Sequence, residues 1–179
     1  MPDPDQTASL RPALLSDCTS LAALSIEVWL GTYIREGVNA FFADYVLAQF
    51  KPAYFAELLP NADEVLIVSE NTDGIDGYVR VTRGQPCPQG SASSTEITTL
   101  YVQPRHHGKG KGLHLLNAAV ETCRNKGWDL PWLAVNSENS NALAFYLHHG
   151  FVTVGETRFC IQDQQFRNDV LQYGGRTEI

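Results

Sequence analysis

Residues 95–121 read TEITTLYVQPRHHGKGKGLHLLNAAVE and contain three different local patterns in succession. Residues 95–102 are rich in the β-branched and aromatic residues that strands favour. Residues 113–127 have the spacing of an amphipathic helix that a glycine closes. Between them lie three glycines and several cationic side chains. The stretch therefore predicts a strand, a glycine-rich loop and a helix that begins near residues 109–112.

The loop is suited to holding an anion, because the start of a helix exposes unpaired N–H groups and carries the positive end of the helix dipole. The glycines let the backbone approach the anion closely, and the cations add charge. The residues expected to bind are Arg105, His107, Gly108, Lys109, Gly110, Lys111 and Gly112. Neither the Walker nor the dinucleotide-binding pattern fits, because no Ser or Thr follows either lysine and the glycines run Gly-x-Gly-x-Gly. The pattern Gln/Arg-x-x-Gly-x-Gly/Ala fits, starting at Arg105.

A second motif follows in residues 134–151, AVNSENSNALAFYLHHGF, with the form V-N-x-x-N-x-x-A-x-x-x-Y-x-x-x-G-F. With both motifs in this order, the sequence resembles the GNAT superfamily of acetyl-CoA-dependent N-acyltransferases from about Leu66 to Leu171. The resemblance implies that the loop amides hold the pyrophosphate of CoA. It also implies that the pantetheine lies between two splayed strands, 95–102 and 131–136. The further cofactor-binding residues implied are Leu100, Tyr101, Val102, Asn136, Asn139 and Tyr146.

Acetyl transfer to an amine needs a base, a donor for the oxyanion and a proton for the departing thiolate. The N–H of Val102 is expected to serve the oxyanion, and Tyr146 matches the family's tyrosine that protonates the sulfur. Glu96 matches the general base of the histone-acetylating branch. The alternatives are a core aromatic for Tyr146 and a solvated carboxylate for Glu96. A covalent acetyl-enzyme is not expected.

The amine pocket of the family is lined by the first two helices. Glu27 could bind a cationic substrate there, and Trp29 and Tyr33 could wall its methylene groups. The alternative is an amphipathic core helix with a solvated acidic face. The C-terminal half looks like the bacterial spermidine/spermine acetyltransferases, which makes a polyamine the leading substrate. The branch that acetylates protein N-termini carries Leu-Glu-Val in the later strand, and this chain has Ala134 in place of that Glu.

The order of elements predicts an α/β (α+β) fold: a mixed, mostly antiparallel central sheet with a splayed strand pair, flanked by about four helices. Helices are expected at 18–33 and, interrupted near Pro52, at 39–59. Two strands are expected at 64–70 and 76–83, joined by a turn at 71–76. A single N-acetyltransferase domain is expected over residues 8–174, with flexible tails at 1–7 and 175–179.

Twenty Asp and Glu against 13 Lys and Arg give a net charge of −7, which disfavours nucleic acid and anionic membranes as partners. Four scattered cysteines are typical of free thiols in a reducing compartment, and no signal peptide or membrane span is recognisable. These features predict a cytoplasmic protein. The five histidines lack a ligand set at zinc spacing, so no metal is expected. The oligomeric state stays open, a homodimer included.

Three alternatives to a small-amine acetyltransferase remain. A protein or peptide amine could be the acceptor. A non-catalytic acyl-CoA sensor would keep the loop without needing Tyr146 or Glu96. A nucleic-acid-binding module would use the basic loop, but the acidity of the chain argues against it.

Overall fold

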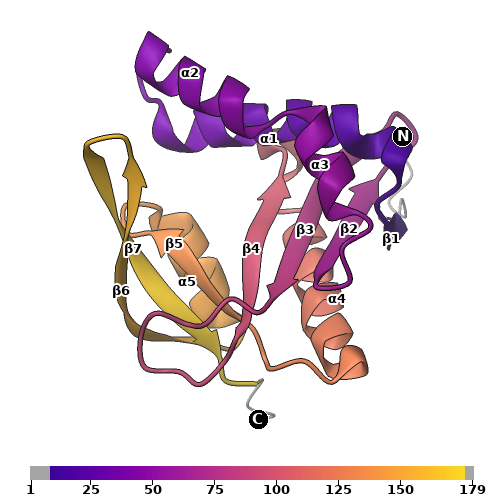
Figure 1. Cartoon of the computed structure of the whole chain (residues 1–179), viewed down its shortest axis with the longest axis vertical. Helices are drawn as coiled ribbons and strands as arrows, with labels where there is room; N and C mark the ends of the chain where they lie inside the picture. Colours follow the sequence, from indigo (N-terminus) through magenta and orange to yellow (C-terminus); the bar gives the residue numbers. More distant parts are fainter. Residues whose placement is uncertain (1–8, 176–179) are drawn as a thin grey trace. The chain divides into compact units, whose positions relative to one another are not determined.

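The computed structural model describes residues 9–175. Their helices and strands, labelled in Figure 1, are β1 (Ser9–Pro12), α1 (Cys18–Tyr33), α2 (Ala40–Gln49), α3 (Pro52–Leu58), β2 (Glu64–Glu70), β3 (Ile75–Arg83), β4 (Thr95–Val102), α4 (Lys111–Lys126), β5 (Trp132–Asn136), α5 (Ser140–His148), β6 (Phe151–Ile161) and β7 (Gln164–Tyr173). Two short 3-10 turns, Leu15–Asp17 and Pro104–His106, precede α1 and the loop before α4.

The helix expected over 39–59 with an interruption near Pro52 forms two helices, α2 and α3. Lys51 is extended, with φ −101° and ψ 144°, and Pro52 is the first residue of α3. Proline disfavours helical backbone in the residue before it, and its fixed φ suits the first helical position. The break therefore has a local cause.

The seven described strands form one sheet in the order β1-β2-β3-β4-β5-β7-β6. β1 pairs with β2, β5 with β7 and β6 with β7, all antiparallel. β4 pairs with β5 in parallel through the register pair Glu96 and Trp132. The predicted fold class, a mixed and mostly antiparallel sheet flanked by helices, is confirmed.

The chain forms two compact units. The first contains the residues up to Arg80 together with Thr99–Ala119, and the second contains Val81–Thr98 together with the residues from Val120 onward. The single domain over 8–174 stays a prediction. Of the expected tails, residues 1–7 and 176–179 lie outside the described residues.

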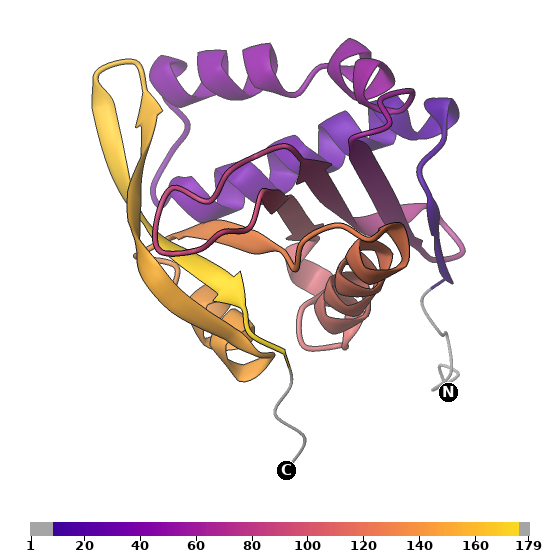
Figure 2. The ribbon, with the colours of Figure 1, turned by 60° about the horizontal axis from the view of Figure 1, so that its bottom comes forward.

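The first unit has its core on one face of β2 and β3, where α1 and α3 cover the strands (Figure 2). Leu21, Phe55 and Tyr78 are almost fully buried there. Each such side chain contributes about 1.5–3 kcal/mol by leaving water. The Tyr78 hydroxyl shares a 2.7 Å hydrogen bond with Ser25 of α1, which fixes the helix over the strand.

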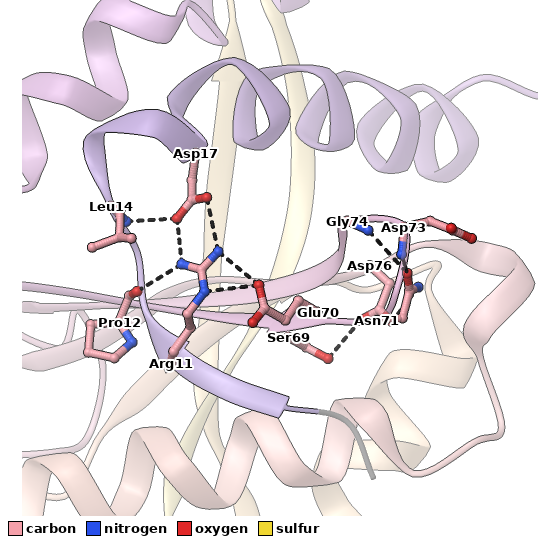
Figure 3. A network of polar contacts seen from close by, with 10 residues as sticks. All are labelled: Arg11, Pro12, Leu14, Asp17, Ser69, Glu70, Asn71, Asp73, Gly74 and Asp76. Carbon is pink, nitrogen blue, oxygen red and sulfur yellow. Dashed lines mark hydrogen bonds and ion pairs between the residues drawn. The ribbon is translucent and has the colours of Figure 1, made fainter. Parts of the chain in front are cut away.

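An arginine clamp ties β1 to its neighbours, as Figure 3 shows. The Arg11 guanidinium donates to both carboxylate oxygens of Asp17, at 2.7 and 3.1 Å, and to Glu70 of β2 at 2.9 Å. The hydrogen bonds from Arg11 hold the pKa of Asp17 below its ordinary value. The clamp thus joins β1 and β2 to the turn that precedes α1.

The turn between β2 and β3 is built by Asn71, whose side-chain oxygen accepts from the N–H groups of Asp73 and Gly74 at 2.8 and 3.2 Å. This is the Asx-type turn that Asn favours. The strand expected from Asp76 begins one residue earlier, at Ile75, so Asp76 is its second residue.

The second unit packs α5 against the long hairpin of β6 and β7 (Figure 2). Tyr146 of α5 lies with its ring 5.6 Å from that of Phe151, and Phe151 lies 5.2 Å from Tyr173. The hairpin register shifts between Thr153 and Gly155, which marks a β-bulge. A Cβ at Gly155 would come within 2.6 Å of Gln89, so the bulge lies close beside the loop before β4.

Candidate functional site

The loop between β4 and α4 passes twice through left-handed backbone. Gly108 has φ +73° and Gly110 has φ +77°, a region that residues with a side chain rarely adopt. A Cβ built at either glycine meets no heavy atom within 4 Å. The loop therefore needs glycine for its conformation and has open space beside its backbone.

α4 starts directly after Gly110 and runs for 16 residues. The N–H of His114 donates to the carbonyl of Gly110 at 3.0 Å, which is the first helical hydrogen bond. The N–H groups of Lys111, Gly112 and Leu113 precede that bond and lack an acceptor within the helix. Together with the helix dipole they give the loop a positive backbone end. The arrangement predicted from residues 95–121 is thus present.

Arg105 is held by an acidic residue of α1. Its guanidinium lies 2.9 Å from one carboxylate oxygen of Glu27, and the side-chain amide of Gln103 donates to the other at 2.6 Å. The Arg105 side chain is 65% exposed and that of Glu27 is 37% exposed. The structure therefore places Glu27, which the sequence assigns to the amine substrate, beside the glycine loop.

Lys111 also has a carboxylate partner. Its ammonium lies 2.5 Å from Asp76 of β3, and the two side chains are 11% and 0% exposed. Lys109, in contrast, is exposed. Sequence reasoning missed Asp76, because its position beside a turn gave no sign of burial. The available signal was a carboxylate within a strand, directly before Gly77 and the apolar pair Tyr78 and Val79.

The end of β4 is shaped by close contacts within the first unit. The His107 imidazole donates a 2.8 Å hydrogen bond to the carbonyl of Val102. The ring of Tyr101 packs edge-on to Tyr78, and Leu100 is half-buried. A Cβ at Gly77 would lie 2.8 Å from the carbonyl oxygen of Tyr101. β3 and β4 therefore approach so closely that glycine is required at this position.

The two motif asparagines, which lie in the second unit, shape the turn between β5 and α5. The side-chain oxygen of Asn136 accepts from the N–H of Glu138 at 2.8 Å, and its carbonyl accepts from Asn139 at 2.9 Å. Asn139 is the N-cap of α5 and accepts from the N–H of Ala142 at 3.1 Å. Both residues thus have a structural role, and their binding of cofactor stays a prediction.

Tyr146 is buried, with 8% of the residue exposed, and lies edge-on to Phe145 and Phe151. Burial raises the pKa of the Tyr146 phenol above its ordinary value of 10. The hydroxyl is therefore protonated at neutral pH, as a proton donor must be. The core role considered from the sequence is present, and it does not exclude the chemical one.

The remaining predicted residues have mixed surroundings. Glu96 of β4 is half-buried and lies opposite Trp132. Trp29 is only 3% exposed, and its ring stacks on Tyr33 at 4.5 Å and contacts Tyr45 at 5.1 Å. Trp29 is thus a packing residue of α1, whereas Tyr33 is half-buried. Contact of either ring with substrate stays a prediction.

Residues 9–175 contain neither a cluster of metal-ligating side chains nor a helix that could span a membrane. No group of three or more His, Cys, Asp or Glu side chains in that part of the chain could hold a metal ion. None of the helices described there is long and apolar enough to cross a membrane.

The chain is similar to known acetyltransferases over most of its length. The model of the "Acetyltransferase (GNAT) family" matches residues 32–151. An uncharacterized N-acetyltransferase of Mycobacterium tuberculosis is 30% identical over 145 residues, which cover 81% of this chain and 89% of that one. An L-amino acid N-acyltransferase of Escherichia coli is 26% identical over 148 residues, covering 83% and 81%. Among solved structures, the PaiA N-acetyltransferase of Thermoplasma acidophilum in complex with coenzyme A has a TM-score of 0.74 at 18% identity, covering 92% and 98%.

Proposed function

Because the chain belongs to the acetyltransferase (GNAT) family, we propose that it transfers the acetyl group of acetyl-CoA to a primary amine by direct attack in a ternary complex. Membership of the family makes the protein an N-acetyltransferase with acetyl-CoA as its co-substrate. The identity of the amine, the direct attack and the residue roles below are the proposal.

The observation that carries the proposal is the backbone of the loop before α4. Gly108 and Gly110 have open space beside them, and the N–H groups at the start of α4, which have no acceptor within the helix, follow at once. A diphosphate fits such a site, because backbone donors and the helix dipole favour a compact anion. Lys109, which lies between these two glycines, is an exposed cation. The loop would therefore hold the pyrophosphate of CoA.

The chemistry needs three groups of this chain. CoA supplies the acetyl group as an activated thioester. The N–H of Val102 would stabilise the oxyanion of the tetrahedral intermediate. The Tyr146 hydroxyl, which is protonated at neutral pH, would donate a proton to the departing sulfur. Glu96 would accept the proton of the attacking amine, directly or through a water.

A polyamine is the substrate we propose first. The net charge of −7 favours cationic small molecules, and the C-terminal half resembles polyamine acetyltransferases. The α-amine of an amino acid is the second candidate, since the Escherichia coli relative is an L-amino acid N-acyltransferase. Glu27 is engaged by Gln103 and Arg105, so its role toward the amine requires that this contact opens.

The test is a screen of polyamines, amino acids, aminoglycosides and peptides with acetyl-CoA, in which the release of free thiol measures turnover. The proposal expects turnover with polyamines above the other amines. Faster turnover with amino acids would select the second candidate. Calorimetry with CoA and with duplex DNA separates the other classes. CoA binding without turnover on any amine would indicate a sensor, and DNA binding would indicate a nucleic-acid-binding module. Absence of CoA binding would contradict the proposed function.

We also propose a cytoplasmic location. All four cysteines, Cys18, Cys87, Cys123 and Cys160, are free thiols, as in proteins of reducing compartments. Burial raises the pKa of Cys123 to about 11, so this thiol is unreactive at neutral pH. Cell fractionation with antibody detection tests the location.

A further inference from the structure

Asp76 is a fully buried carboxylate with three side-chain partners. Its Oδ1 accepts from the Ser69 hydroxyl at 2.7 Å. Its Oδ2 accepts from the Asn71 amide at 3.0 Å and from the Lys111 ammonium at 2.5 Å. Figure 3 shows Ser69, Asn71 and Asp76 at the end of the β2–β3 hairpin. A buried charge is tolerated only with such partners, so the loss of any one of these contacts should affect the others.

The main chain of Asp76 makes a further contact. Its carbonyl oxygen accepts from the N–H of Gln103 at 2.9 Å. Gln103 is the first residue after β4, and Lys111 is the first residue of α4. One residue of β3 therefore holds both ends of the glycine-rich loop, one through its backbone and the other through its side chain.

This arrangement has an energetic consequence for the loop. Glycine loses more conformational freedom on ordering than any other residue, and the loop contains Gly108 and Gly110. If its ends were free, a ligand would have to supply the cost of ordering it. Fixing the ends in advance lowers that cost. In addition, the Lys111 side chain is 11% exposed and its charge is compensated by the buried carboxylate of Asp76, which limits what the ammonium can offer to a phosphate.

We propose that Asp76 is a positioning residue that pre-organises the CoA-binding loop by holding Gln103 and Lys111, and that Lys111 acts through Asp76 and not by touching phosphate. The inference rests on the proposed binding of CoA by this loop.

A double-mutant cycle tests the inference, with the variants Asp76→Asn, Lys111→Met and their combination. We expect each single variant to raise the calorimetric Kd of CoA about tenfold, which is about 1.4 kcal/mol. The double variant should also lose about tenfold, because both changes remove the same contact. An additive loss of about a hundredfold would mean that Lys111 contacts the phosphates directly, and it would overturn the inference.

Glu64→Gln is the matched control. Glu64 forms another buried ion pair of the same unit, with Arg80 at 2.7 Å and side-chain exposures of 5% and 13%. This variant should lose thermal stability without changing the Kd of CoA. If it weakened CoA binding as much as Asp76→Asn does, the effect would be general destabilisation, and the inference would fail.

Hydrogen exchange of the cofactor-free protein gives a readout that does not depend on CoA. The amides from Gln103 to Lys111 should exchange faster in Asp76→Asn than in the wild type or in Glu64→Gln. If Asp76→Asn does not fold, Ser69→Ala removes one of the three partners and should change the same amides in the same direction. Unchanged loop exchange in the folded variant overturns the inference. A wild type that does not bind CoA refutes the proposed function alone.

Discussion

Gly77→Ala should show how tightly β3 packs against the end of β4, which is one of the two strands expected to flank the pantetheine. The added Cβ would lie 2.8 Å from the carbonyl oxygen of Tyr101 and 3.2 Å from side-chain carbons of Val102 and Leu115. A backbone oxygen cannot rotate away as the end of a flexible side chain can. The end of β4 must therefore shift, or the strand pair must open.

The cost follows from overpacking, which is about 1–3 kcal/mol for an extra methyl group in a tight core. In a chain of this length, 1 kcal/mol corresponds to about 2–4 °C in Tm, so Tm should fall by about 2–12 °C. The shift reaches the backbone of Tyr101 and Val102. If it removes about 1 kcal/mol of binding, the Kd of CoA rises about fivefold.

Differential scanning calorimetry and titration with CoA measure both effects, and Gly31→Ala is the control. Gly31 lies in the last turn of α1, and a Cβ there meets nothing within 4 Å. Alanine favours the helix by roughly 0.5–1 kcal/mol, so Tm should rise by about 1–4 °C with unchanged CoA binding. A Gly77→Ala protein as stable as the wild type would refute the close approach of the two strands.

Tyr146→Phe removes the proposed proton donor, so kcat should fall about 10²-fold while the Kd of acetyl-CoA changes less than about twofold; equal losses in thiol-release and calorimetric assays would remove the acid role. Glu96→Gln should slow the reaction most at low pH, where the amine is protonated, and a loss of the same size across the pH–rate profile would indicate a structural role. Gly110→Asp introduces a negative charge that repels the pyrophosphate and a side chain that strains the backbone at φ +77°, so calorimetry should detect no CoA binding. Unaltered affinity would show that the loop does not hold CoA. The hydrogen bonds from Arg11 keep the pKa of Asp17 below 3.8, so their stabilisation is complete above about pH 4 and is lost as the pH falls through the lowered pKa. Arg11→Met should therefore raise the acid-unfolding midpoint measured by circular dichroism, and an unchanged midpoint would contradict this reasoning.

The local signals in the sequence were sufficient for most elements of the fold. The strand predicted at 95–102 and the helix predicted at 18–33 have the observed bounds, because apolar periodicity and turn residues act over a few positions. The glycines at 108 and 110 predicted the loop for the same reason, since their backbone conformation is a local property. Asn139 was also identifiable, and it caps α5.

The contacts that give the site its electrostatics could not be predicted in this way. Lys111 pairs with Asp76, which lies 35 positions earlier, and Arg105 pairs with Glu27, which lies 78 positions earlier. No periodicity within one element encodes such a partner. The burial of Trp29 has the same origin, because it depends on aromatic side chains of α2.

The two carboxylates beside the loop, Glu27 and Asp76, determine how the binding of an anion would depend on ionic strength. Arg105 is balanced by Glu27 and Lys111 by Asp76, so of the three Lys and Arg side chains at residues 105–111 just Lys109 has no ion pair within the described chain. A ligand with several negative charges would approach an almost neutral surface on an acidic protein. Attraction at distances beyond the Debye length of about 10 Å would then be weak, and short-range donors of the main chain would dominate. Added salt should consequently weaken the complex far less than it weakens complexes formed by clusters of unpaired cations.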